Sequence, residues 1–360
     1  MAMHHIITDG WSIGILIMEI AALYEAFSRG LPSPLPELPL QYVDFARWQR
    51  LWLSGPVLED QLSYWRQRLL GLAPLLELPT DRPRPAVQSY AGTYQVFDLS
   101  PELTQRVKAF CLEAEVSPFI MLLSVFKLLL HRYTSRTDIC VGTPIANRNR
   151  AEVEPLIGFF VNTLALRTDL SGETGFRELV GRVKETALEA YAHQDLPFEM
   201  VIDALQPERS LSHSPLFQTM FVLQNVPAQP LELPGLRLRA TDVDTRTSLF
   251  DLTLVMSEVD ESLRGSIEYT TDLFDAATID RMIVHYRSLL ESALSDADLP
   301  IADLPLLSEA EKQLVVREWN DTEQNSFLRG QCLHELVEAR AHRLPEAVAV
   351  ARPLLGARPV

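Results

Sequence analysis

Helical and strand-like patterns alternate through more than two hundred residues of this chain, and this alternation constrains the fold most strongly. Short stretches typical of strands occur at 93–99, 139–143, 164–168, 219–224, 236–240, 250–258 and 264–269. Apolar residues at helical spacing predict helices that begin near residue 100 and that cover 117–133, 176–194, 198–205 and 276–293. Because both kinds of element must bury an apolar face, this order predicts a layered α/β fold.

The first ninety residues predict helices and connectors without strands. Helical patterns cover 11–27, 42–54 and 58–70, and a connector with four prolines separates the first two. The aromatic side chains of the second and third helices are expected to clamp these two helices together; they are Phe45, Trp48, Trp52, Tyr64 and Trp65. The proline- and arginine-rich stretch 79–88 predicts a boundary between two lobes.

The acidic balance and the few cysteines narrow the classes of function. A net charge of −16 disfavours nucleic-acid binding, because no basic excess exists to displace the counterions of phosphates. Cys111, Cys140 and Cys332 lack metal-ligand spacing, and so sparse a count is typical of a reducing compartment. The apolar run 13–23 is shorter than a membrane span and contains Glu19. We expect a cytoplasmic protein with no metal site, no nucleic-acid partner and no membrane segment.

Two adjacent histidines near the N-terminus are the strongest chemical signal. His4 and His5 precede Asp9 and Gly10, and a strongly apolar helical stretch follows. An imidazole exchanges protons near neutral pH, and a glycine at a helix start allows a backbone N–H to approach a reacting carbonyl. Taken alone, a double histidine is more often a pair of structural histidines at a strand end than a catalytic pair. A zinc site lacks further ligands, and a nucleophilic triad lacks a serine in a suitable turn.

Four further segments follow this motif and remove the ambiguity. They are Tyr42–Trp48, Ile157–Arg167, His193–Glu199 and Arg209–Phe217. In this order, and together with the double histidine, they closely resemble the later motifs of condensation domains from non-ribosomal peptide synthetases. The resemblance covers about residues 1–305.

The resemblance implies a fold and a reaction. Such domains resemble chloramphenicol acetyltransferase, with two α/β lobes and a tunnel between them that contains the double-histidine loop. A donor acyl or peptidyl thioester and an acceptor aminoacyl thioester enter from opposite faces, and the acceptor amine attacks to form an amide. Each substrate is carried on the 4′-phosphopantetheine of a carrier domain, so no cofactor is expected to bind this chain directly.

The resemblance also assigns roles around the double histidine. His5 matches the family's second histidine and is expected to act as a general base or to orient the amine. His4 supports the loop, and Asp9 holds it through an ion pair with an arginine. Gly10 offers its backbone N–H to the oxyanion.

Other residues are expected to line or brace the tunnel. The substrate and tunnel candidates are Trp11, Ser12, Asn162, Arg209 and Ser212. Asn162 is expected to bind backbone groups, and Arg209 and Ser212 to anchor a loop near the acceptor entrance. The polar run 147–150 is expected to be a solvated loop, with contact to a carrier phosphopantetheine as the alternative. Residues 159–161 are expected to pack within the lobe, and residues 193–195 to form a cap and turn network.

The predicted organisation has four parts. Residues 1–85 are a remnant of the N-terminal lobe, because only three residues precede the double histidine. Residues 86–303 are the C-terminal lobe, 304–330 a linker, and 331–360 a truncated start of an adenylation domain, which Cys332–Leu336 and Pro345–Val350 resemble. Within this last part, the pattern at 333–342 predicts an amphipathic helix and that at 347–351 a short strand. The first lobe is thus expected to be incomplete, and the isolated chain to be inactive and prone to aggregation.

Relatives within the family remain as alternatives. Heterocyclisation domains carry aspartates in place of the double histidine, and epimerisation domains lack the Phe-Phe-Val-Asn-Thr pattern, so both are disfavoured. The motifs favour the type that accepts L-configured donors, with a dual epimerisation and condensation domain left open. An alternative of another class is a non-catalytic fragment that binds carrier proteins.

Overall fold

The structure is a computed structural model that describes residues 3–208, 210–224, 245–259, 261–321 and 332–346, and the backbone of the short strands β5 (Glu232–Leu233) and β6 (Leu236–Arg237). The chain divides into two compact units, Met1–Ser308 and Glu309–Val360. The strand expected at 236–240 is present at Leu236–Arg237, and its remainder lies outside the described residues. The strand expected at 347–351 also lies outside them.

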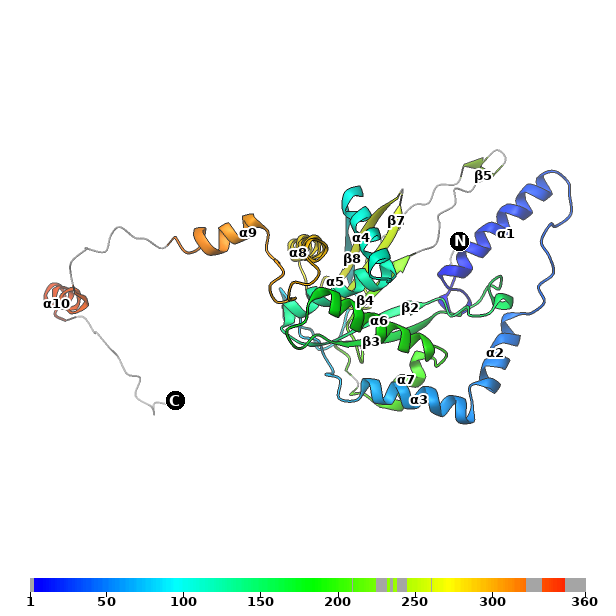
Figure 1. The fold of residues 1–360 in the computed structure, drawn as a ribbon, viewed down its shortest axis with the longest axis horizontal. Coiled ribbons are helices and arrows are strands. Elements are labelled where there is room, and N and C mark those ends of the chain that lie inside the picture. Colours follow the sequence, from blue (N-terminus) through cyan, green and yellow to red (C-terminus); the bar gives the residue numbers. More distant parts are fainter. Residues whose placement is uncertain are drawn as a thin grey trace, which may run out of the picture. The chain divides into compact units, whose positions relative to one another are not determined.

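A six-stranded mixed sheet organises the first unit, with strand order β1-β8-β7-β4-β2-β3 (Figure 1). The strands are β1 (Gly92–Asp98), β2 (Asp138–Ile145), β3 (Asn162–Asp169), β4 (Thr219–Gln224), β7 (Leu252–Val259) and β8 (Ser262–Thr270). Strand β4 runs parallel to both of its neighbours, β2 and β7, and the other pairs are antiparallel. The α/β class and the strands predicted at these positions are confirmed.

Four helices pack against this sheet and enclose the main core (Figure 1). They are α4 (Pro101–Glu113), α5 (Pro118–Thr134), α6 (Phe176–Ala192) and α8 (Ala276–Ser295). Ser100 and Ser117 begin α4 and α5, because each side-chain oxygen accepts a backbone N–H of the first turn and a proline follows at the first helical position. Every residue of α5 from 120 to 130 is buried. This helix therefore lies at the centre of the core.

Lys127 is the one charged residue among the buried residues of α5. Its side chain is fully buried, and its Nζ donates to the carbonyl oxygens of Ile139 at 3.1 Å and Leu166 at 2.5 Å. These bonds tie the helix to β2 and β3. Burial of the ammonium lowers the pKa of Lys127 to about 7.

Replacing Lys127 by methionine is expected to change how stability depends on pH. Between pH 7 and the unfolded value of 10.5, the unfolded chain binds more protons at this site, so the site's contribution to stability rises with pH. The difference in unfolding free energy between the two proteins should therefore shift by about 1.4 kcal/mol per pH unit at most. Urea unfolding at pH 7, 8 and 9 measures it, and parallel pH profiles would contradict the prediction.

Helices α1 (Gly10–Ser28), α2 (Tyr42–Trp52) and α3 (Gly55–Leu69) precede the sheet, as the sequence predicts. The prediction that aromatic side chains clamp α2 and α3 together is wrong. Phe45 of α2 packs on Phe160 with ring centroids 4.7 Å apart, whereas Tyr64 of α3 stacks on His193 at 3.9 Å. The loops at the end of the sheet supply the aromatic partners, so each helix docks on a different segment of the chain.

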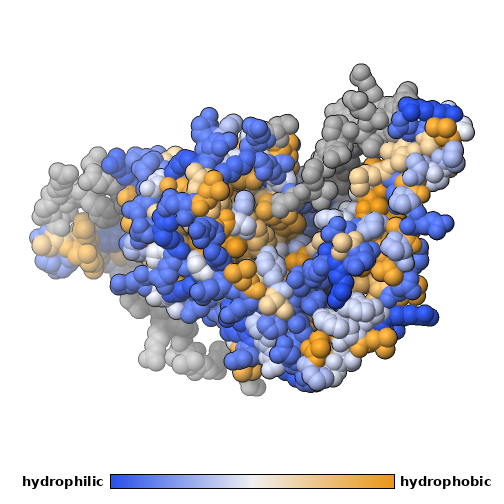
Figure 2. Space-filling view, turned by 45° about the vertical axis from the view of Figure 1, so that its right-hand side comes forward, coloured by the Kyte–Doolittle hydropathy of each residue, from blue (hydrophilic) through white to orange (hydrophobic). Residues whose placement is uncertain are grey.

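Helix α1 keeps a large apolar surface exposed (Figure 2). Its exposed apolar residues are Trp11, Ile13, Ile17, Met18, Ile20, Tyr24 and Phe27. The helix has 19 residues, more than the apolar run predicted, and a mean hydropathy of 1.4, so by length and composition it passes as a candidate membrane span. Helices α4 and α5, taken together as one bent segment, are also long and apolar enough to be a candidate span, although α5 is a core helix. Such helices are weak evidence for a membrane, because core helices also pass.

The second unit contains short helices. They are α9 (Glu309–Gln313), the π-helical turn η3 (Leu314–Glu318) and α10 (Leu333–Arg343). The carboxylate of Glu335 accepts the backbone N–H of Cys332 at 2.8 Å and so caps the start of α10. The helix predicted from residue 333 is confirmed.

Candidate active site

The double-histidine loop forms a short 3₁₀ turn, η1 (His5–Ile7), directly before α1. Nδ1 of His4 accepts the backbone N–H of Ile6 at 3.1 Å, so this imidazole caps the turn. The His5 side chain is exposed, and its only described ring contact is with Phe159, with centroids 5.3 Å apart and planes at 84°. The loop thus fixes the first histidine in its own structure and leaves the second accessible.

Asp9 joins the loop to a distant segment of the chain. Its Oδ1 accepts the backbone N–H of Ser12 at 2.8 Å and so caps α1, while Oδ2 accepts the backbone N–H of Phe160 at 2.9 Å. Nη2 of Arg148 donates to Oδ1 at 3.2 Å, and both charged side chains are about 3% exposed or less. The predicted ion pair between Asp9 and an arginine is confirmed.

The pKa of Asp9 reflects these contacts. Burial alone would raise this pKa, but the hydrogen bonds from the backbone N–H groups of Ser12 and Phe160 and the charge of Arg148 together hold it below its ordinary value. The carboxylate is therefore ionised at neutral pH, and it acts as a structural acceptor.

Ser12 uses its whole hydrogen-bonding capacity within the fold. Its hydroxyl accepts from Arg148 at 2.7 Å and from the backbone N–H of Gly158 at 3.1 Å, and it donates to the carbonyl of Gly158 at 2.8 Å. The residue is fully buried. No lone pair or proton of this hydroxyl is left for a further partner, so Ser12 braces the loop, one of the two roles expected of the tunnel candidates.

Arg148 is buried, which departs from the expectation of a solvated loop at 147–150, whereas Asn149 and Arg150 are exposed as expected. Its Nη1 donates to the carbonyl oxygens of Val153 at 2.7 Å and Leu156 at 2.8 Å. Its guanidinium carbon lies 4.1 Å from the ring centroid of Phe160, and its side chain is 2% exposed. A polar run is usually solvated, but here Arg148 is buried because it pairs with the carboxylate of Asp9, which lies 139 residues away in sequence.

Gly10 and Trp11 begin α1 beside the histidines. A Cβ placed on Gly10 would meet no atom within 4 Å, so the space next to its backbone is open. Nε1 of Trp11 donates to the carbonyl of Glu154 at 3.2 Å, and the ring is 43% exposed. The first N–H groups of a helix have no partner within the helix, so this end offers donors to a bound oxygen.

Asn162 braces the start of β3, as the sequence predicts. Its Nδ2 donates to the carbonyls of Gln194 and Leu196, each at 2.8 Å, and its Oδ1 accepts the backbone N–H of Phe198 at 3.0 Å. These bonds fix the turn between α6 and α7 (Phe198–Leu205). The predicted turn network at 193–195 is part of the same arrangement, and Asn162 has no remaining amide proton for substrate.

Ser212 lies in an anchored loop, whereas Arg209 lies outside the described residues. The carbonyl of Ser212 accepts from Nη1 of Arg84 at 3.2 Å, and its hydroxyl bonds with that of Ser210 at 2.8 Å. Arg84 also pairs with the buried carboxylate of Asp251 at the start of β7. Sequence reasoning missed both members of this pair, and only the cluster of arginines at 79–88 pointed to it.

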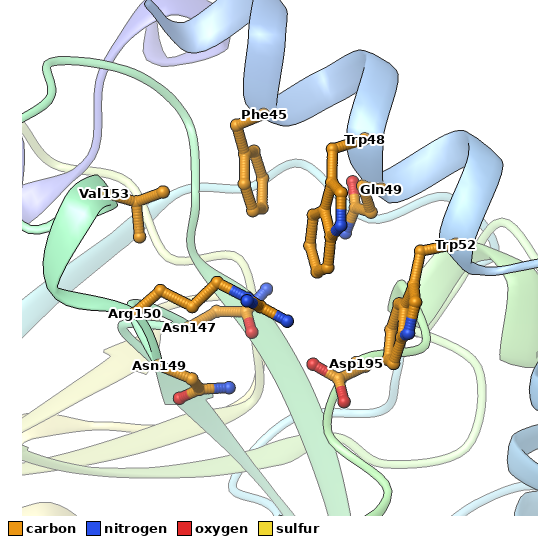
Figure 3. Close-up of a pocket in the computed structure, with 9 residues that line it drawn as sticks. All are labelled: Phe45, Trp48, Gln49, Trp52, Asn147, Asn149, Arg150, Val153 and Asp195. Carbon is orange, nitrogen blue, oxygen red and sulfur yellow. The ribbon is translucent and has the colours of Figure 1, made fainter. Parts of the chain in front are cut away.

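A pocket beside α2 is lined by none of the histidine-loop residues (Figure 3). It encloses about 330 Å³ with its open mouth, and its lining residues are Phe45, Trp48, Gln49, Trp52, Asn147, Asn149, Arg150, Val153 and Asp195. The Arg150 guanidinium lies 4.4 Å from the Trp48 ring centroid, and Trp48 stacks on Trp52. Burial raises the pKa of Asp195, which Arg150 partly offsets.

Comparison with known proteins identifies the family. The family model described as the condensation domain matches residues 1–316. One of the linear gramicidin synthase proteins from Brevibacillus parabrevis is 50% identical over 350 residues, and malpinin synthetase from Mortierella alpina is 45% identical over 347 residues. These alignments cover 97% and 96% of this chain but only 7% and 4% of the two relatives, so the chain spans a small part of their length.

A solved structure agrees as well. The X-domain from teicoplanin biosynthesis superposes with a TM-score of 0.77 at 30% identity, over 84% of this chain and 70% of that one. The mixed sheet with its covering helices is thus the chloramphenicol-acetyltransferase-like fold that the motifs implied. The chain belongs to the condensation-domain family of non-ribosomal peptide synthetases.

Proposed function

We propose that this domain forms an amide bond between a donor acyl or peptidyl thioester and an acceptor aminoacyl thioester, with His5 at the reacting atoms. The observation that carries the proposal is the contrast within the motif. Asp9 and Ser12 are buried and saturated with hydrogen bonds, whereas the His5 side chain is exposed immediately ahead of the start of α1.

The chemistry needs a proton acceptor and donors for an oxyanion. The acceptor amine attacks the thioester carbonyl, the carbon–sulfur bond breaks, and the amine proton passes by way of His5 to the departing thiolate. In this reaction Gly10 offers its backbone N–H to the developing oxyanion; the support is that Gly10 is the first residue of α1, where the N–H groups have no partner within the helix. Binding both thioesters at one place supplies a further large part of the rate.

The partners follow from this reaction. Carrier domains with 4′-phosphopantetheine bring both substrates, and an adenylation domain is the neighbour that activates an amino acid. L-configured donors remain the favoured type. Cys111, Cys140 and Cys332 are free thiols, which supports a reducing compartment, and we propose the cytoplasm.

A carrier-loading assay tests the proposal. The domain, in the polypeptide where it naturally occurs, is incubated with a carrier bearing an aminoacyl thioester as donor and a second carrier bearing an aminoacyl thioester as acceptor. Mass spectrometry of the acceptor arm should detect the dipeptidyl thioester. Carrier binding without dipeptide, across several loaded amino acids, would favour the non-catalytic alternative and overturn the proposal.

A further inference from the structure

The segment Gly158–Phe160 is fixed by side chains at each of its residues. The hydroxyl of Ser12 binds both the N–H and the carbonyl of Gly158, and Oδ2 of Asp9 accepts the N–H of Phe160. The hydroxyl of Tyr42 donates to the carbonyl of Phe159 at 2.8 Å. The start of α1 and the start of α2 therefore hold this segment from two sides.

Gly158 is required for this contact. A Cβ on Gly158 would lie 2.2 Å from the ring of Tyr42, so the ring rests directly on the backbone. The same tyrosine ring meets Phe160 with centroids 5.1 Å apart and planes at 85°. The Tyr42 ring therefore packs tightly on the segment Gly158–Phe160 and limits where the backbone of Phe159 can lie.

The side chain of Phe159 leaves this fixed backbone toward the double histidine. Phe160 is 2% exposed and buried in the small apolar cluster with Val153 and Leu156, but Phe159 is 37% exposed. Its ring contacts His5 in the T-shaped arrangement described above. An exposed imidazole on a short turn otherwise has several rotamers available.

We propose that Phe159 is a positioning residue that selects the productive rotamer of His5, and that Tyr42 holds Phe159 in place for this task. The proposal rests on the proposed catalytic role of His5. Aromatic pairs of this geometry favour one arrangement by a factor of about 2 to 10. Phe159 does not touch the reacting atoms, and it acts through the imidazole.

A spectroscopic test does not depend on activity. The ring current of Phe159 displaces the imidazole proton resonances of His5, which a His5→Gln spectrum identifies. In Phe159→Leu these resonances should move toward random-coil positions. The control is Phe27→Leu, which replaces an exposed phenylalanine on α1 and should leave the His5 resonances unchanged. Tyr42→Phe should give a smaller displacement in the same direction. Coincident His5 resonances in Phe159→Leu and the unaltered protein would overturn the proposal.

A kinetic test separates positioning from simple packing. Phe159→Leu should lower kcat for amide formation by about 2- to 10-fold with little change in KM, because fewer molecules hold His5 in the productive rotamer. Phe159→Tyr keeps the ring and should restore kcat. A loss of kcat that Tyr does not restore would overturn the positioning role. If His5→Ala retains full activity, the proposed function fails, and the resonances still decide whether Phe159 orients the ring.

Discussion

Replacing His5 by alanine is expected to lower the rate of amide formation by about 10²- to 10⁴-fold, the usual contribution of a positioned general base. The exposed imidazole has no hydrogen bond to another described residue, so its removal should leave the fold intact. Single-turnover measurements with carrier-bound donor and acceptor report the chemical step. Stability should change by less than about 0.5 kcal/mol, as for most exposed positions.

The neighbouring histidine provides the matched control. His4 contributes an acceptor to the N–H of Ile6, and asparagine supplies a comparable acceptor at a cap position. His4→Asn should therefore retain a rate within a few-fold of the unaltered protein. Turnover by His5→Ala at the unaltered rate would remove His5 from the chemistry, and equal losses in both variants would assign the effect to the loop.

Replacing Arg148 by methionine is expected to cost about 3–5 kcal/mol of unfolding free energy, because Asp9 would keep a buried charge without its partner. The two side chains are 2% and 3% exposed, and the same guanidinium also binds Ser12 and two backbone carbonyls. Urea unfolding of both proteins measures the loss. Asp9→Asn should cost a similar amount, and the double variant should cost less than the sum of the two, since neither charge is then left alone.

An exposed ion pair serves as control. Arg29 pairs with Glu25 at 2.9 Å, but its side chain is 60% exposed. Arg29→Met should change stability by no more than about 1 kcal/mol. A comparable loss in Arg29→Met and Arg148→Met would contradict the argument from burial.

The pH dependence has a defined sign. The folded pKa of Asp9 lies below its ordinary value of 3.8, so its contribution is complete above that value and is lost as pH falls through the folded pKa. Arg148→Met raises the folded pKa of Asp9, because it removes a cation and a hydrogen bond. The unaltered protein should thus lose stability relative to the variant as pH falls below about 4.

Local patterns predicted most elements of the fold. Ser100 and Ser117 begin their helices as expected, because an N-cap depends on a side chain and on backbone groups two or three positions away. The strand at Thr219–Gln224 matches its predicted range for a similar reason, since alternation and turn residues act over a few neighbours. The predicted aromatic clamp between α2 and α3 was wrong, because the partners of an aromatic ring depend on tertiary contacts.

The same division applies to the candidate site. The residue types and the order of the motifs were sufficient to predict the family and an arginine partner for Asp9, and the chemical role of the double histidine stays a prediction. The sequence did not identify that arginine as Arg148, and it assigned Phe159 to packing within the lobe. The partner of Asp9 and the contact of Phe159 with His5 could be identified only from the tertiary structure.

The sequence by itself determined the order of helices and strands and the motifs of the family, because periodicity, caps and motifs depend on neighbouring residues. The tertiary structure alone decided that Asp9, Ser12 and Tyr42 hold the segment Gly158–Phe160, and that Phe159 meets His5. Those contacts join residues more than a hundred positions apart. Their geometry follows from the contact of the starts of α1 and α2 with the segment between β2 and β3, which no local sequence pattern predicts.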